Sequence, residues 1–178
     1  MQIEVGERPS VVSTPERVSP KRLSYALCLL VLVLDQASKL FVLHSLDLEH
    51  TQPLIISAFF DLILVWNRGI SYGLFQQNDA TGQAILLGAT GIAILGLLVW
   101  MARVRTARLA VALGFLTGGA IGNAIDRAAY GAVVDFLHLH WGEWSWYVFN
   151  LADAAIVVGV VILMYDSWRN EDQAGSKL

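Results

Sequence analysis

The feature that most constrains this chain is an apolar stretch at residues 82–102, which contains no Asp, Glu, Lys, Arg or His. A helix of about 20 apolar residues crosses the hydrocarbon core of a membrane. Three further apolar stretches, at residues 23–43, 109–125 and 149–165, carry few charges. Only 15% of the chain is charged, against about 25% in soluble domains. These patterns predict an all-α membrane protein with four transmembrane helices.

Two other classes of chain fit less well. A secretory signal peptide at the first stretch would have an apolar region of about 7–15 residues followed by a small-residue cleavage site, and neither is present. The net charge of −3 gives no basic surplus that would attract nucleic acid. The single cysteine, Cys28, excludes an intrachain disulfide and a multi-cysteine metal site.

A fifth apolar run, from Leu54 to Trp66, is too short to span a membrane as a helix. It is rich in β-branched and aromatic residues, which favour strands. We expect a small extracytoplasmic β element on the membrane surface. A hairpin inside the bilayer is disfavoured because lipid does not tolerate open sheet edges.

The basic residues indicate the orientation. Nine of the twelve fall in the two terminal tails, residues 1–22 and 169–178, or between the second and third stretches. Because cytoplasmic segments are enriched in Lys and Arg, we expect both termini in the cytoplasm. The four-helix domain then covers residues 23–168, and its outer segments are residues 44–81 and 126–148.

Four carboxylates are candidates for function, because charge inside or near a spanning segment is costly and commonly functional. In the predicted orientation, Asp35 lies in the outer half of the first span and Asp126 at the outer end of the third. Asp153 lies at the outer start of the fourth span, and Asp135 lies in the outer loop before it. All four are therefore predicted to lie at the same depth, near the outer surface of the membrane.

Some of these polar residues also have a purely structural explanation. Lys39 follows Asp35 by four residues, so the two can pair on one helix face, or Lys39 can snorkel to the interface. Asn150 can cap the fourth helix. Such explanations are weaker for Asp135 and Asp153, which have apolar neighbours and no Lys or Arg within four positions.

Two aspartates in a dry pocket share a proton, because like charges a few ångströms apart do not both ionise. One then activates water while the other protonates a carbonyl oxygen. Other chemistries fit poorly. Cys28 has no histidine near it in sequence. We interpret the histidines as solvated or interfacial rather than as zinc ligands, and we expect no metal and no cofactor; they are His44, His50, His138 and His140.

Five motifs, in chain order, resemble those of the lipoprotein signal peptidase family, also called signal peptidase II. They follow the patterns D-Q-x-[ST]-K, N-x-G-x-[AS]-F-G, G-G-A-x-G-N-x-x-D-R, V-V-D-F and F-N-x-A-D. Each is weak alone, but five in order are specific. They occupy residues 35–39, 67–73, 118–127, 133–136 and 149–153. Tyr72 stands where the family commonly has phenylalanine.

The resemblance implies an aspartic endopeptidase of the bacterial cytoplasmic membrane. It would remove the signal peptide of a prolipoprotein, cutting before a cysteine that carries diacylglycerol, near the outer leaflet. Separately, we expect a monomer, because one peptide substrate and one aspartate pair need no partner subunit. Asp135 and Asp153 match the catalytic pair. The residues expected to line or support the site are Asn67, Gly69, Asn123, Arg127 and Asn150, together with Asp35, Lys39 and Asp126.

Three rival functions are less consistent with the sequence. A transporter or proton channel would place polar residues through the full membrane depth, whereas the inner halves of the four spans are nearly free of charge. A packing or assembly protein would give Asp135 and Asp153 no role. A presenilin-type protease would carry a Gly-x-Gly-Asp motif, which this chain lacks.

Overall fold

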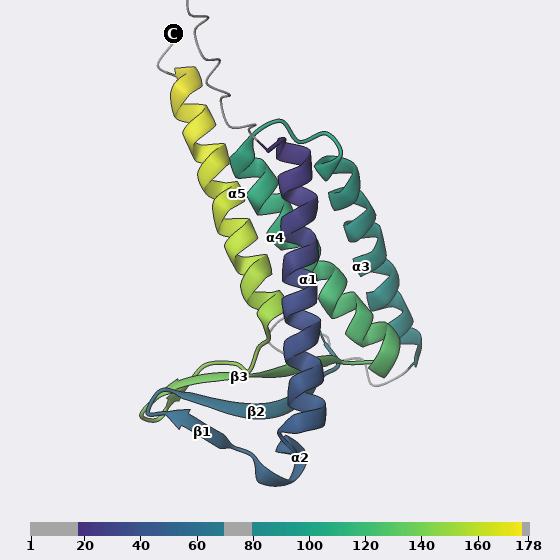
Figure 1. Cartoon of the computed structure of the whole chain (residues 1–178), viewed down its shortest axis with the longest axis vertical. Helices are drawn as coiled ribbons and strands as arrows, with labels where there is room; N and C mark the ends of the chain where they lie inside the picture. The colour runs from purple at the N-terminus through teal and green to yellow at the C-terminus, as the bar shows by residue number, and fades with distance from the viewer. Residues whose placement is uncertain (1–17, 70–79, 176–178) are drawn as a thin grey trace, which may run out of the picture.

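The computed structural model describes residues 18–69 and 80–175. Figure 1 shows the long helices side by side, with a sheet at the end opposite the start of the first helix and the end of the last. The elements, in chain order, are α1 Pro20–Ser45, α2 Leu48–Thr51, β1 Leu54–Ser57, β2 Phe60–Asn67, α3 Ala80–Met101, α4 Ala107–Tyr130, β3 Val133–Trp141, β4 Trp144–Ser145 and α5 Leu151–Gly175.

Four of these helices, α1, α3, α4 and α5, are long and apolar enough to cross a membrane. Helix α4 is the centre of the bundle and packs against the other three. Glycines on α4 permit this approach, because they let two helix backbones come close together. A Cβ atom at Gly114 would lie 2.8 Å from the Ser24 carbonyl oxygen of α1, and one at Gly118 would lie 2.7 Å from that of Cys28.

Two of the long helices begin at capping side chains. The Ser19 hydroxyl accepts a hydrogen bond from the Arg22 N–H (3.4 Å) at the start of α1, and the Thr106 hydroxyl accepts one from the Leu109 N–H (3.3 Å) at the start of α4. Helix α4 ends at Gly131, whose φ of 67° is readily adopted by glycine.

The boundaries of α4 and the position of Asp135 differ from the sequence-based prediction. Helix α4 continues past residue 125 to Tyr130, so Asp126 and Arg127 lie within the helix rather than at its end. Asp135 lies on strand β3, not in a loop. Hydropathy falls at charged residues, so it ends a predicted span early when those charges are paired inside the protein.

The four strands form one antiparallel sheet in the order β1-β2-β3-β4. The apolar run from Leu54 to Trp66 forms the β1–β2 hairpin, which confirms the predicted β element. The register of β2 and β3 places Val65 opposite Asp135. Because β3 and β4 come from the second outer segment, the sheet is larger than expected, and an all-α class describes the fold only approximately.

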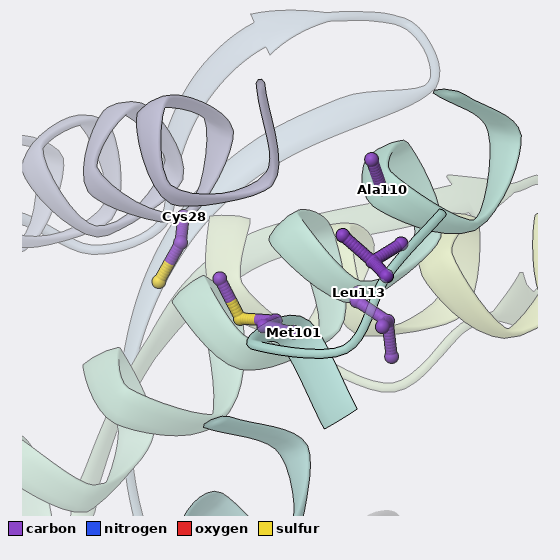
Figure 2. Close-up of a cluster of buried hydrophobic side chains, with 5 residues drawn as sticks. Cys28, Met101, Ala110 and Leu113 are labelled. Carbon is purple, nitrogen blue, oxygen red and sulfur yellow. The ribbon is translucent and has the colours of Figure 1, made fainter. Parts of the chain in front are cut away.

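Two clusters of buried apolar side chains lie at opposite ends of the bundle. Cys28, Met101 and Leu113 belong to the cluster at the α3–α4 connection, where Figure 2 shows the side chains gathered between helices. Val42 of α1 and Phe136 of β3 belong to the second cluster, which fixes the sheet to α1. The predicted site lies at this second end.

Candidate active site

The two aspartates predicted to be catalytic come from adjacent elements. Asp135 lies on β3, and Asp153 lies in the first turn of α5. The segment leading into α5 pairs with β3: the Leu137 N–H donates to the Phe149 carbonyl (2.8 Å), and the Phe149 N–H donates back to Leu137 (3.0 Å). Figure 1 shows β3 running below the start of α5. Strand pairing thus brings both carboxylates to one junction.

Asp135 is buried, with 2% of its surface exposed. Its two carboxylate oxygens accept hydrogen bonds from the side-chain amides of Asn150 (2.6 Å) and Asn67 (3.0 Å). Burial and then the negative charge of Asp153 raise the pKa of Asp135 to about 7, against the opposing effect of the two amides. The carboxyl group can therefore exchange a proton near neutral pH.

Asp153 takes part in the cap of α5. Its N–H donates to the Asn150 side-chain oxygen (2.9 Å), and its carboxylate accepts from the Asn150 N–H (3.3 Å). This reciprocal pair is a capping box, with Asp in the place of the usual Glu or Gln. The structure confirms the prediction that Asn150 caps the helix. The cap also fixes the direction of the Asp153 carboxylate.

Asn67 ends β2 and is oriented by the residues after it. Its side-chain oxygen accepts from the Gly69 N–H (3.0 Å), so its NH₂ group faces Asp135. Arg127 donates to the Gly69 carbonyl (2.9 Å) and to that of Asn123 (3.4 Å). Gly69 and Arg127 thus hold the strand end that presents Asn67.

Lys39 is buried beneath this junction, with 2% of its surface exposed. Its ammonium lies 2.8 Å from both Asp35 and Asp126 and donates to the Asn123 side-chain oxygen at 3.1 Å. The Asp35–Lys39 pair is confirmed, whereas the alternative of a snorkelling Lys39 is wrong. Asp126 also contacts the Lys39 ammonium, because α4 places Asp126 at the interface with α1.

The same two carboxylates also hold the elements that carry the aspartates. Asp35 accepts from the Ala152 N–H at the start of α5 (2.9 Å), and Asp126 accepts from the Val134 N–H of β3 (3.1 Å). Their placement therefore couples helices α1 and α4 to the residues adjacent to Asp135 and Asp153.

Gln36 belongs to this network, although it was not among the site residues predicted from the sequence. Its amide donates to Asp126 (3.0 Å), to the Gly122 carbonyl (3.2 Å) and to Asp35 (3.2 Å). The available signal was its position inside the first motif, one residue after Asp35 in an apolar span.

The histidines lie away from the two aspartates. His138 and His140 project from β3 next to Asp61, with His140 Nε2 3.0 Å from the Asp61 carboxylate. His44 lies next to the Leu40 carbonyl within α1. Among residues 18–69 and 80–175, no group of three His, Cys, Asp or Glu side chains is arranged to hold a metal ion.

Comparisons with known proteins identify the family. Residues 27–169 match the model of the family described as Signal peptidase (SPase) II. The chain is 58% identical over 148 residues to the lipoprotein signal peptidase of Methylorubrum extorquens (strain PA1), covering 83% of this chain and 86% of that protein. It is 53% identical over 150 residues to that of Methylobacterium radiotolerans, covering 84% and 88%.

Solved structures agree on the fold. A bacterial membrane enzyme determined by the in meso method at 2.3 Å resolution matches with a TM-score of 0.74 and 22% identity, covering 84% of this chain and 90% of that one. A second, at 1.9 Å resolution, gives 0.68 and 23%, covering 80% and 90%. Tyr72, which stands where the family commonly has phenylalanine, lies outside the residues that the structure describes. The chain belongs to the signal peptidase II family and is therefore an aspartic protease with a multi-pass membrane fold.

Proposed function

We propose that this chain removes the signal peptide from prolipoproteins already modified with diacylglycerol, cutting just before the modified cysteine. Its relatives are named lipoprotein signal peptidases, which supports prolipoproteins as the substrate class. The lipid requirement and the cut position come from the family resemblance of its five motifs. The catalytic groups would be the carboxylates of Asp135 and Asp153.

One observation carries the assignment of the catalytic pair. Asn150, which is fully buried, donates from its side chain to Asp135 (2.6 Å) and from its backbone to Asp153 (3.3 Å). A single residue thus fixes both carboxylates relative to each other. The pKa of about 7 at Asp135 supports a pair that holds one proton near neutral pH.

The proposed reaction uses that single proton. The ionised carboxylate takes a proton from water, whose oxygen attacks the scissile carbonyl carbon. The protonated carboxyl transfers its proton to the carbonyl oxygen, giving a neutral tetrahedral intermediate. Collapse of this intermediate breaks the C–N bond. The proton taken from water passes to the departing amine of the cysteine, and the proton on the former carbonyl oxygen returns to the pair.

The bonding pattern is consistent with a preorganised site. Each carboxylate accepts hydrogen bonds from groups that are themselves held: Asn67 by Gly69, and Asn150 by the α5 cap. Preorganised donors need not reorganise as charge moves in the transition state. Strands β2 and β3 contribute Asn67 and Asp135, so we propose that the sheet also shields the reaction from bulk water.

We further propose that both termini are cytoplasmic and that the pair acts at the outer leaflet of the bacterial cytoplasmic membrane. The basic residues support this orientation. Exposed aromatic side chains on the sheet, including Phe59, Trp141 and Trp144, suit the membrane–water interface. We also propose a functional monomer, because one peptide substrate and one aspartate pair need no partner subunit.

Cleavage of defined substrates tests the substrate claim. Purified protein is incubated with a diacylglyceryl-modified prolipoprotein and, as the matched control, with the same precursor lacking the lipid. We expect mass spectrometry to find a new N-terminus at the lipid-modified cysteine in the first reaction only. Equal cleavage of both precursors would contradict the lipid requirement, and a cut elsewhere would contradict the proposed position.

Cysteine labelling tests the orientation. In a Cys28→Ala background, Ser57→Cys on the β1–β2 hairpin and Ala102→Cys after α3 report opposite ends of the bundle. We expect a membrane-impermeant maleimide to label only the Ser57→Cys variant in spheroplasts. Labelling of only the Ala102→Cys variant would show that the orientation is reversed.

A further inference from the structure

We propose that Lys39 is a positioning residue for the catalytic pair, acting through the side-chain amide of Asn123. This inference rests on the proposed function, because it concerns how the pair is held. Lys39 is buried under the junction, and the described contacts of its ammonium are with Asp35, Asp126 and Asn123. It would therefore influence the reaction without touching the substrate.

The ammonium of Lys39 has three N–H groups and no acceptor. Its three neighbours are the Asp35 carboxylate at 2.8 Å, the Asp126 carboxylate at 2.8 Å and the Asn123 side chain at 3.1 Å. Each neighbour can take one N–H. Because the ammonium only donates, the Asn123 atom facing it must be the oxygen.

Because the Asn123 oxygen faces Lys39, the direction of the Asn123 NH₂ group is also determined. With its oxygen towards Lys39, Asn123 turns its NH₂ group to the Asp153 carboxylate, to which it donates at 2.8 Å. The opposite rotamer would set NH₂ against the ammonium and remove the donor from Asp153. Asn150 also donates to the Asn123 oxygen (3.2 Å). That bond is between neutral groups, and charge-assisted bonds are stronger.

Lys39 thus sits at the head of a directed chain of hydrogen bonds, from its ammonium to the Asn123 oxygen and from the Asn123 NH₂ to Asp153. Bonds in such a chain polarise one another, so the charge of Lys39 strengthens the donor on Asp153. A purely structural ion pair would lack this directional link to the catalytic pair.

Removing Lys39 alone leaves Asp35 and Asp126 facing each other in a buried site, and the protein then risks not folding. The test therefore uses Asp35→Asn/Lys39→Met, which preserves the summed charge of this group at −1. The new amide oxygen can still accept from the Ala152 N–H. Asp35→Asn alone is the reference, and Arg108→Met, at the ion pair with Asp166 far from the site, is the control.

We expect Asp35→Asn/Lys39→Met to lower kcat about 10- to 100-fold relative to Asp35→Asn, the range for losing a hydrogen bond to a charged group. KM should change less than about twofold, because Lys39 is buried, with 2% of its surface exposed, and so does not meet the substrate. A kcat within about twofold of the Asp35→Asn reference in folded protein would overturn the proposal.

A second background separates positioning from stability. In Asn123→Ala/Asp35→Asn, the amide through which Lys39 acts is absent. Adding Lys39→Met there should leave kcat within about twofold, because the effects of groups in one network are not additive. A further loss of tenfold or more would show that Lys39 acts by another route, and the proposal would be wrong.

Failure of this inference is distinguishable from failure of the proposed function. Asp135→Asn and Asp153→Asn are assayed in the same series. If both abolish cleavage while the Lys39 variants show no effect, only the positioning role is contradicted. If either aspartate variant retains full activity, the catalytic pair itself is misassigned.

Discussion

The side chains at the two ends of α4 are buried in different surroundings. Near its start, Ala110 and Leu113 are fully buried in an apolar cluster with Met101. Near its end, Asn123 and Asp126 are also buried but are held by hydrogen bonds and by the Lys39 ammonium. One helix therefore carries an apolar packing end and a polar end that lies next to Asp135 and Asp153.

The two ends of α4 are stabilised by different interactions. Lipid is as apolar as a leucine side chain, so the apolar end is stabilised by close packing rather than by the hydrophobic effect. At the polar end, an unpaired group would cost several kcal/mol. Each polar group there requires a specific partner, and that requirement fixes the geometry around Asp135 and Asp153.

The largest expected effect on stability is at the polar end. Lys39→Met should destabilise the fold by about 3–5 kcal/mol, because it leaves two buried carboxylates without their cation. Chemical unfolding in detergent measures this. Asp35→Asn/Lys39→Met should recover part of the loss, and equal stability of Lys39→Met and the wild type would show that the ion pairs do not hold the helices together.

A cavity at the apolar end should affect stability without affecting catalysis. Leu113→Ala should cost about 1–2 kcal/mol, less than in a soluble core because only packing is lost. Its kcat per folded molecule should match the wild type. A kcat reduced tenfold in folded protein would mean that the two ends are coupled, which contradicts the comparison.

Stability and activity should both depend on pH through Asp135. Its pKa is about 7 in the fold and close to 4 in the unfolded chain. The folded state then binds more protons between these values, so stability should fall as pH rises from about 4 to about 7. The proposed reaction needs that proton, so kcat should fall about tenfold per pH unit above the pKa.

Stability and kcat measured across this range check the sign. Asp135→Asn should remove the stability change between pH 4 and 7. If instead stability rises through this range in the wild type only, the environment of Asp135 must favour its ionised form.

The smallest expected effect is at the Arg108–Asp166 ion pair near the apolar end. The Arg108 side chain is 43% exposed, and the pair spans 2.9 Å. Arg108→Met should cost only about 1 kcal/mol, because solvent screens the exposed Arg108 side of the pair although Asp166 itself is buried. A loss as large as that of Lys39→Met would remove the contrast between the two ends.

Much of the fold was predictable because lipid imposes strong rules on sequence. The four long helices and the β1–β2 hairpin follow from the length and composition of apolar runs. The end of α4 was not predictable in this way. Its last turns contain Asp126 and Arg127, whose burial depends on partners in α1 and in the residues after β2.

The site was predictable at the level of residues but not of contacts. The five motifs predicted which side chains form the site, and the common depth of these residues predicted that they would lie close together. The spacing of Asp35 and Lys39 predicted one ion pair, whereas the structure shows Lys39 shared among three partners. Gln36 was missed because its role depends on Asp126 and Gly122, which are distant in sequence.

The most direct test of the account is the cleavage rate of a diacylglyceryl-modified prolipoprotein by Asp135→Asn and Asp153→Asn, compared with the wild type at pH 6. Loss of a catalytic acid or base typically costs about 10²–10⁴-fold. We expect both variants to lose at least about 100-fold in kcat. The comparison is made on folded protein, because the NH₂ of an asparagine at position 135 cannot accept the hydrogen bond that Asn67 or Asn150 donates there. Full activity in either folded variant would contradict the catalytic pair.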